Sequence, residues 1–179
     1  MSGENATLEI NGAVKPPRSS DVVILLEESS CISTAGLTDI IRKLENSLRA
    51  QGLKENRYAM IGFAGKGPHR KPHIRTSSGQ IWAHSTLFKI SDDIKMNGDG
   101  QGDLYGAIEF AASTLKFRAG VSKTMIALTC GDEKCGSDAR YPDTLTLLLE
   151  NDFKLHMLTP KEFTYKVQFM MTVKSVFLT

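Results

Sequence analysis

The chain has 179 residues, of which 41% are hydrophobic and 23% are charged, and its formal net charge is +2. These proportions are typical of one globular domain, and the small net charge does not indicate nucleic acid as a partner. No apolar run approaches the ~20 residues that a membrane-spanning helix needs, and the polar segment after Met1 does not resemble a signal peptide. We therefore predict no transmembrane segment, and an extracellular protein would contain this chain as a fragment.

Residues 1–20 are predicted to be a tail and linker in front of a domain over 21–179. The Pro-Pro pair at 16–17, followed by Arg-Ser-Ser, is typical of a domain boundary. Asn5-Ala6-Thr7 has the pattern of a glycosylation acceptor, which is used only in a secreted protein.

The central strand of the domain is predicted at Val22–Leu26, where five apolar residues follow one another. An apolar run without alternation suits a strand that is buried on both faces, as in a parallel sheet. The polar loop after this strand contains Glu27, Ser29 and Cys31. Because open α/β sheets bind ligands at the carboxyl ends of their strands, this loop is the first candidate site.

Helices and strands are predicted to alternate after this loop. Apolar side chains recur at helical spacing from Leu37 to Leu48, with Ser33 or Thr34 as the N-cap and Gly52 just past the end. The further expected elements are a strand over 57–64, an edge strand near 73–76, a strand over 80–83, a short helix over 85–94, a helix capped by Asp103, a strand over 124–129, a helix through Leu145, Leu148 and Leu149, and a strand over 153–158.

This order predicts an α/β fold with three layers: a doubly wound, mostly parallel sheet with one antiparallel edge strand, covered by helices on both faces. Residues 164–179 are apolar enough for one more strand but lack a covering helix. We therefore expect the domain to have an atypical or truncated C-terminal end.

Three segments resemble the von Willebrand factor type A (vWA) domain, and the resemblance covers about residues 20–160. They are the opening strand with its serine loop at 21–33, the loop and helix start at 102–108, and the strand end at 125–131. The resemblance implies a vWA or Rossmann-like fold and a non-catalytic role in binding another protein. It also implies a metal-ion-dependent adhesion site in the loops that follow the strands.

The resemblance places the family's five metal positions on Glu27, Ser29, Cys31, Asp103 and Cys130, and only Ser29 keeps the family's residue type. Mg²⁺ prefers oxygen ligands in octahedral geometry, whereas the two cysteines offer sulfur. We therefore expect a degenerate site without a metal, and we expect no cofactor.

Three cysteines leave several arrangements open. Cys31 and Cys130 follow strands that are expected to be neighbours, so a disulfide could join the two loops if the Cα atoms lie within roughly 7 Å. Cys130 and Cys135 could instead close a small ring within one loop. A zinc site made of the three cysteines and an acid matches no standard spacing, and no histidine lies near Cys31 or Cys130 in the sequence to activate a thiol.

Two other loops carry polar or charged groups. The basic loop is defined by Lys66, Arg70, Lys71 and Arg75, and it is a candidate contact for an anionic glycan, an anionic lipid or an acidic protein. The glycine-rich loop at 97–103 is similar to a calcium loop, but Ile108 stands where the twelfth-position acid is needed.

Two histidines also lie in the basic loop. His69 and His73 are four residues apart, and Pro72 between them argues against a helix that would align their rings for a metal. The sequence therefore predicts no metal site at these two residues. Trp82 is predicted to be a packing residue.

The preferred function is a protein-interaction module of the adhesion type within a larger, extracellular protein. Its predicted contact surface consists of the loops at 27–33, 98–103 and 130–136.

Two alternatives remain. Segments at 56–63, 78–82 and 117–124 are similar to the vWA-like segment of arthropod lipoproteins of the apolipophorin type, which implies a structural appendage of a lipid carrier. The other alternative is a hydrolase in which Ser29 is the nucleophile. It requires a base within hydrogen-bond reach, and outside the basic loop only His84 and His156 are candidates.

Overall fold

The computed structural model describes residues 18–34, 36–90, 94–98, 102–130 and 140–159. The elements in chain order are β1 (Ser20–Glu27), α1 (Leu37–Ala50), β2 (Arg57–Phe63), the 3₁₀ helix η1 (Gly67–Arg70), β3 (His73–Arg75), α2 (Leu104–Thr114), β4 (Ser122–Leu128), α3 (Tyr141–Glu150) and β5 (Phe153–Leu158). The predicted glycosylation acceptor, the predicted strand over 164–179 and Cys135 lie outside the described residues.

The strands form one five-stranded sheet in the order β3-β2-β1-β4-β5. β1 is parallel to both of its neighbours, β4 is parallel to β5, and the short β3 runs antiparallel to β2 at the edge. Leu26 at the carboxyl end of β1 lies opposite Leu128 of β4, so the loops after these two strands leave the sheet side by side. The predicted α/β class, the mostly parallel sheet and the antiparallel edge strand are confirmed.

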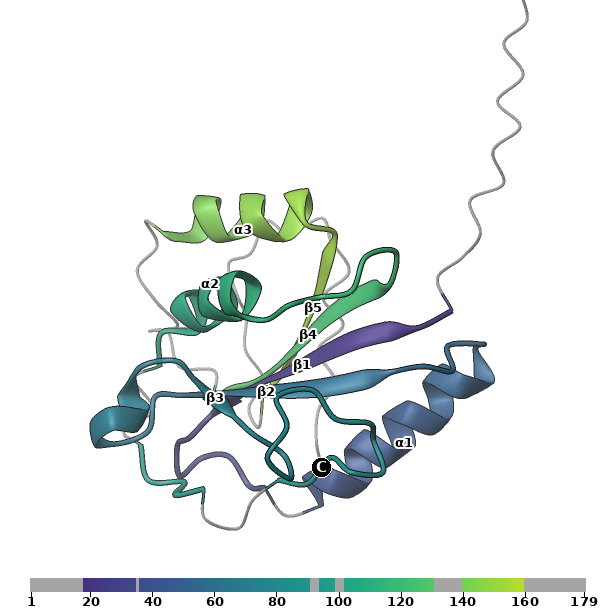
Figure 1. Ribbon diagram of the computed structural model, residues 1–179. Coiled ribbons are helices and arrows are strands. Elements are labelled where there is room, and N and C mark those ends of the chain that lie inside the picture. The colour runs from purple at the N-terminus through teal and green to yellow at the C-terminus, as the bar shows by residue number, and fades with distance from the viewer. Residues whose placement is uncertain (1–17, 35, 91–93, 99–101, 131–139, 160–179) are drawn as a thin grey trace, which may run out of the picture.

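Helices cover both faces of the sheet, with α2 and α3 on one face and α1 on the other (Figure 1). Successive residues of a strand point to opposite faces. Val23 and Leu25 accordingly belong to the core cluster under α2 and α3, whereas Ile24 and Leu26 belong to the cluster that includes Ile41 of α1. β1 is buried along its whole length, as its unbroken apolar run predicts.

The two long helices begin in different ways. Asp103 caps α2 as predicted, because its carboxylate accepts a hydrogen bond of 2.8 Å from the backbone N–H of Gly106. The N-cap of α1 is Gly36, at φ 76° and without a side-chain cap, so the prediction of Ser33 or Thr34 is wrong. Glycine adopts this left-handed conformation readily, and the chain uses it to turn into the helix.

The segment between β3 and α2 differs most from the prediction. Residues 80–83 make only isolated bridges, Tyr58 with Ala83 and Ser77 with Gln80, so the predicted strand is wrong. The described residues 84–90 form a turn and no helix. Ser77 explains part of this difference, because its hydroxyl accepts a hydrogen bond of 2.7 Å from the N–H of Lys89 and holds the segment as a loop.

Candidate functional site

The loops after β1 and β4 are joined by a disulfide between Cys31 and Cys130. The Cα atoms of the two cysteines are 5.7 Å apart, and 99 residues separate them in the chain. The bond confirms one of the pairings left open by the sequence. It excludes the ring between Cys130 and Cys135 and the zinc site, because neither Cys31 nor Cys130 retains a free thiolate.

Glu27, the first adhesion-site position, is buried and faces β4. Its carboxylate accepts hydrogen bonds from Thr129 Oγ1 at 2.6 Å and from the backbone N–H of Cys130 at 2.8 Å. Glu27 therefore holds the end of β4 in place, close to the disulfide.

Ser29 and Asp103 also have partners within the protein. Ser29 is buried, and its hydroxyl donates to the backbone oxygen of Gly98 at 3.4 Å, next to an isolated parallel bridge between the two residues. Asp103 caps α2 and forms an ion pair with Arg140.

The five positions do not suit Mg²⁺. Two of them are consumed by the disulfide, and each of the three oxygen-bearing side chains has a hydrogen-bond partner in the protein. An octahedral ion needs several free oxygen ligands in one place. These residues instead tie the loops together at the carboxyl end of the sheet.

Glu28 is a buried acid at this end of the sheet that sequence reasoning missed. Its side chain is 1% exposed, and Arg75 of β3 donates to both of its oxygens, at 2.8 and 2.9 Å. Burial on its own raises the pKa of Glu28, but the hydrogen bonds from His73 and Arg75 outweigh burial, so the pKa is lowered. The edge strand was predicted but its register was not, and only the pairing of β3 with β2 brings Arg75 and His73 to Glu28.

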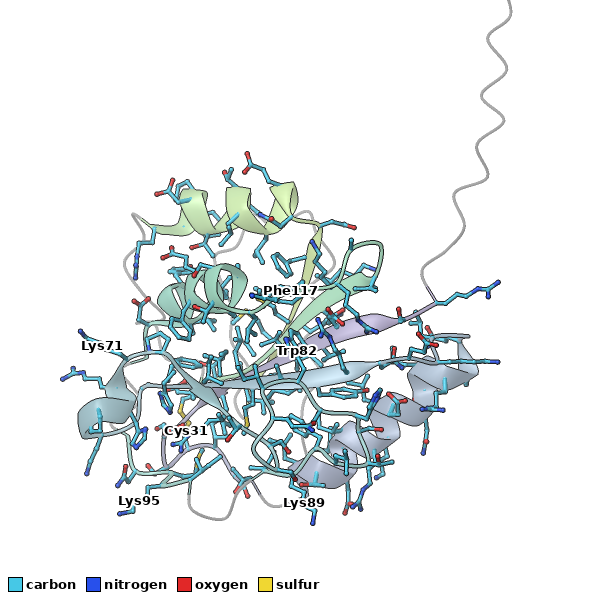
Figure 2. The ribbon with its side chains drawn as sticks, viewed as in Figure 1. Cys31, Lys71, Trp82, Lys89, Lys95 and Phe117 are labelled. Atoms are coloured by element: carbon cyan, nitrogen blue, oxygen red, sulfur yellow. A yellow bond between two sulfur atoms is a disulfide. The ribbon has the colours of Figure 1, made fainter. Side chains whose placement is uncertain are left out.

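The basic loop is less free than its composition indicates. Lys66, Arg70 and Lys71 are exposed, whereas the Arg75 side chain is only 17% exposed and is paired with Glu28. Figure 2 shows Lys71 at the same end of the sheet as Cys31. Lys66 and Arg70 belong to the segment that follows the carboxyl end of β2, so the exposed cations lie at this end of the sheet. Arg75 adds no free positive charge to them.

A second buried acid lies at the opposite end of β1. Asp21 accepts two hydrogen bonds from Arg57, at 2.9 and 2.8 Å, and two from Arg118, both at 2.8 Å. Burial raises the pKa of Asp21, but the hydrogen bonds from the two arginines outweigh it and lower the pKa. The Arg57 guanidinium lies 4.1 Å above the ring of Trp82, which packs edge-on against Phe117. Trp82 is thus a packing residue, as predicted.

The geometry gives no support to Ser29 as a nucleophile. His84 Nδ1 lies 3.1 Å from the backbone oxygen of Asn56, next to the amino end of β2, whereas Ser29 follows the carboxyl end of β1. His156 is in the middle of β5, paired with Ile126, and burial lowers its pKa, as does the nearby Lys154. Ser29 itself is 3% exposed and already donates its hydroxyl hydrogen to Gly98.

Comparison with known proteins places the fold but assigns no activity. No protein-family model matches the sequence, and no curated protein matches it. Among solved structures, proximal thread matrix protein 1 from the mussel byssus superposes with a TM-score of 0.54 at 14% identity, over 81% of this chain and 38% of that one. This chain therefore spans well under half the length of the byssus protein. The conserved protein BatB from Bacteroides thetaiotaomicron superposes with a TM-score of 0.48 at 16% identity, over 79% and 66% of the two chains. A von Willebrand factor type A protein from Catenulispora acidiphila gives 0.45 at 13% identity, over 80% and 33%.

The chain has a three-layer α/β fold with a mostly parallel sheet, which it shares with proximal thread matrix protein 1. At these identities the likeness concerns the fold alone, and function has to be argued from the site. Among the residues that the structure describes, no helix has the length and apolar character needed to cross a bilayer.

Proposed function

We propose that this chain is a non-catalytic interaction module of a larger extracellular protein. It binds a partner protein through the loops at the carboxyl end of the sheet, and it does so without Mg²⁺. The proposal rests on the bonding of the five adhesion-site positions. Each of them is bonded within the protein, and two are joined covalently.

Loops that are joined by a disulfide favour binding through shape complementarity. A surface that is already ordered loses less conformational freedom on association than a flexible one. The disulfide joins two of the loops, and Ser30, Cys31 and Ser33 are exposed beside it. Disulfides persist in oxidising compartments, which supports an extracellular location.

The basic loop extends this contact surface in the proposal. Lys66, Arg70 and Lys71 are exposed and lie at the same end of the sheet, so they suit an anionic glycan or lipid headgroup on or near the partner.

The test is capture of the partner from extracellular fluid by the folded, oxidised domain, compared with two variants. Ser30→Arg combined with Ser33→Arg changes the exposed loop after β1. Gln51→Arg adds the same side chain to an exposed position after α1, at the other end of the sheet. We expect the wild type and Gln51→Arg to retain one partner and the double variant to lose it.

Equal capture by the double variant would contradict the proposed surface. If the domain captured no partner at all, the alternative of a structural appendage, such as one in a lipid carrier, would be favoured. A thermal melt in millimolar Mg²⁺ or Ca²⁺ supplies the second test. We expect an unchanged Tm, and a clear rise would show that the adhesion site is intact.

A further inference from the structure

Three potential metal ligands converge beside the sheet, outside the five adhesion-site positions. Glu28 follows β1, His69 is in η1 and His73 begins β3. His69 Nδ1 lies 3.2 Å from His73 Nε2, and His73 Nε2 lies 3.1 Å from Glu28 Oε1. The three ligand atoms all lie within 4.8 Å of one another. No helix joins His69 to His73, as Pro72 predicts, but a 3₁₀ turn and a strand bring the two rings together without one.

The spacing of these atoms matches a tetrahedral ion. Zinc–nitrogen and zinc–oxygen bonds of about 2.0–2.1 Å at tetrahedral angles separate neighbouring ligand atoms by roughly 3.3 Å. Two of the observed separations, 3.1 and 3.2 Å, are close to that value. The third pair of ligand atoms, from His69 and Glu28, lies within 4.8 Å, and a bound ion would draw these two atoms together.

The ring of His73 is oriented as a metal ligand requires. Its Nδ1 lies 2.9 Å from the backbone oxygen of Lys71, a contact that suits an N–H donating to a carbonyl. A histidine that donates from one nitrogen to a backbone oxygen presents the lone pair of the other nitrogen, which is the usual arrangement around a protein-bound metal. In the metal-free chain Nε2 faces Glu28 Oε1 and His69 Nδ1, and it donates a hydrogen bond to the carboxylate. A bound cation would take the place of that proton and be shared by all three groups.

The backbone holds all three ligands in place. The N–H of Glu28 donates to Phe63 at 2.8 Å, the N–H of Gly65 donates to His69 at 3.0 Å, and His73 is paired with Gly62 across the edge of the sheet. These bonds belong to the sheet and to the turn, so they exist before any ion binds. A site that is ordered in advance binds its ligand at a lower entropic cost.

Two glycines leave the space that the cluster occupies. A Cβ on Gly62 would overlap Glu28 Oε1 and would lie 2.8 Å from His73 Nε2. A Cβ on Gly65 would lie 2.8 Å from Glu28 Oε2 and 2.9 Å from the Cβ of His69. Real Cβ contacts essentially never come this close, so a side chain at either position would displace one or more of the three ligands.

We propose that Glu28, His69 and His73 form a binding site for a divalent transition-metal ion of the zinc class, with water as the fourth ligand. Two imidazoles and a carboxylate suit Zn²⁺ and its neighbours better than Mg²⁺ or Ca²⁺. Arg75 donates to both oxygens of the same carboxylate and so fixes its orientation, while the positive charge of the guanidinium limits the affinity for a cation. The site does not depend on the proposed function, because none of the five adhesion-site positions takes part in it.

The test uses the oxidised domain without a histidine tag, treated with a chelator and then titrated with ZnCl₂ in a calorimeter. We expect one zinc per chain. We also expect Tm to rise by roughly 5–10 °C when free zinc exceeds Kd about a hundredfold, with no rise in MgCl₂ at the same concentration.

Two single variants, their combination and a matched control locate the ion. His69→Gln and His73→Gln should each raise the Kd for zinc at least about tenfold, since each removes one of three protein ligands. His69 lies in an exposed turn, so His69→Gln tests the site even if His73→Gln disturbs the edge strand. The matched control is His84→Gln, which changes an exposed histidine outside the cluster and should leave the Kd unchanged. The proposal is overturned if zinc produces neither heat nor a change in Tm, or if it binds equally well to the double variant His69→Gln/His73→Gln.

Discussion

The two ends of β1 each bury a carboxylate, but they use it differently. At the amino end, Asp21 is saturated by four hydrogen bonds from Arg57 and Arg118, beneath an aromatic cluster. At the carboxyl end, Glu27 and Glu28 face a disulfide, an edge strand and two imidazoles, and exposed loops surround them. The amino end is a structural ion-pair cluster, whereas the described residues at the carboxyl end combine buried acids with exposed side chains in the loops.

Removal of the disulfide at the carboxyl end should cause the largest loss of unfolding free energy. The double variant Cys31→Ser/Cys130→Ser should lose about 4 kcal/mol of unfolding free energy, since the bond closes a loop of about 100 residues in the unfolded chain. Urea denaturation with and without a reducing agent measures the loss. Reduction should destabilise the wild type and leave the double variant unchanged. Equal stability of the two oxidised proteins would refute a stabilising role for the bond.

The ion-pair cluster at the amino end should be the next most costly to break. Asp21→Asn keeps the shape of the side chain but leaves two buried or half-buried guanidinium groups without their counter-charge. We expect a loss of about 3 kcal/mol in unfolding free energy, measured by urea denaturation at pH 7. Lys54→Gln, at an exposed position near the same end, is the control and should change stability by less than about 0.5 kcal/mol. If both substitutions cost the same, the cluster is not a major source of stability.

The same acid predicts how stability depends on pH. The pKa of Asp21 in the folded chain is below its ordinary value of 3.8, so the ionised form favours folding. This contribution is complete above pH 3.8 and is lost as the pH falls through the lower pKa of the folded state. The difference in stability between the wild type and Asp21→Asn should therefore be constant from pH 7 to about pH 5 and should shrink below pH 3.8. A difference that stayed constant down to pH 2 would contradict the assignment.

The smallest effect concerns the start of α2. Asp103→Ala removes the cap on the N–H of Gly106 and should cost about 1 kcal/mol. Its ion pair with Arg140 is about half exposed and should add little. Asp103→Asn separates the two contributions, because asparagine still caps the helix but carries no charge. Chemical denaturation should show a near-normal stability for Asp103→Asn; a loss as large as that of Asp103→Ala would mean that the charge matters more than the cap.

Much of the fold could be predicted from the sequence because its signals are local. The apolar run of β1, the helical spacing of α2 behind Asp103 and the strand over 153–158 each fix one element, and alternation of strands and helices fixes a parallel sheet. The described residues 80–90 were mispredicted because the Ser77 hydroxyl bonds to the backbone of Leu87 and Lys89, ten and twelve residues further on, and holds the segment as a loop. The start of α1 was mispredicted because a left-handed glycine replaced the usual side-chain cap.

The candidate sites could be predicted only where the order of the strands in the sheet brings their residues together. The neighbouring exits of β1 and β4 led to the pair Cys31 and Cys130 among the possible disulfides. The cluster of Glu28, His69 and His73 was missed because the four-residue spacing of the two histidines was considered only as part of a helix. It is produced instead by an edge strand that folds back across β2, and no local pattern reports such a contact.

The central claim is that the loops after β1 and β4 are covalently closed where a metal site would otherwise lie. Trypsin digestion of the unreduced protein, followed by mass spectrometry, tests it directly, since cleavage after Lys134 separates Cys130 from Cys135. We predict that the peptide 19–42 is linked to the peptide 124–134 and that the link disappears on reduction. A link between the peptides 124–134 and 135–140, or free thiols at both Cys31 and Cys130, would contradict the account.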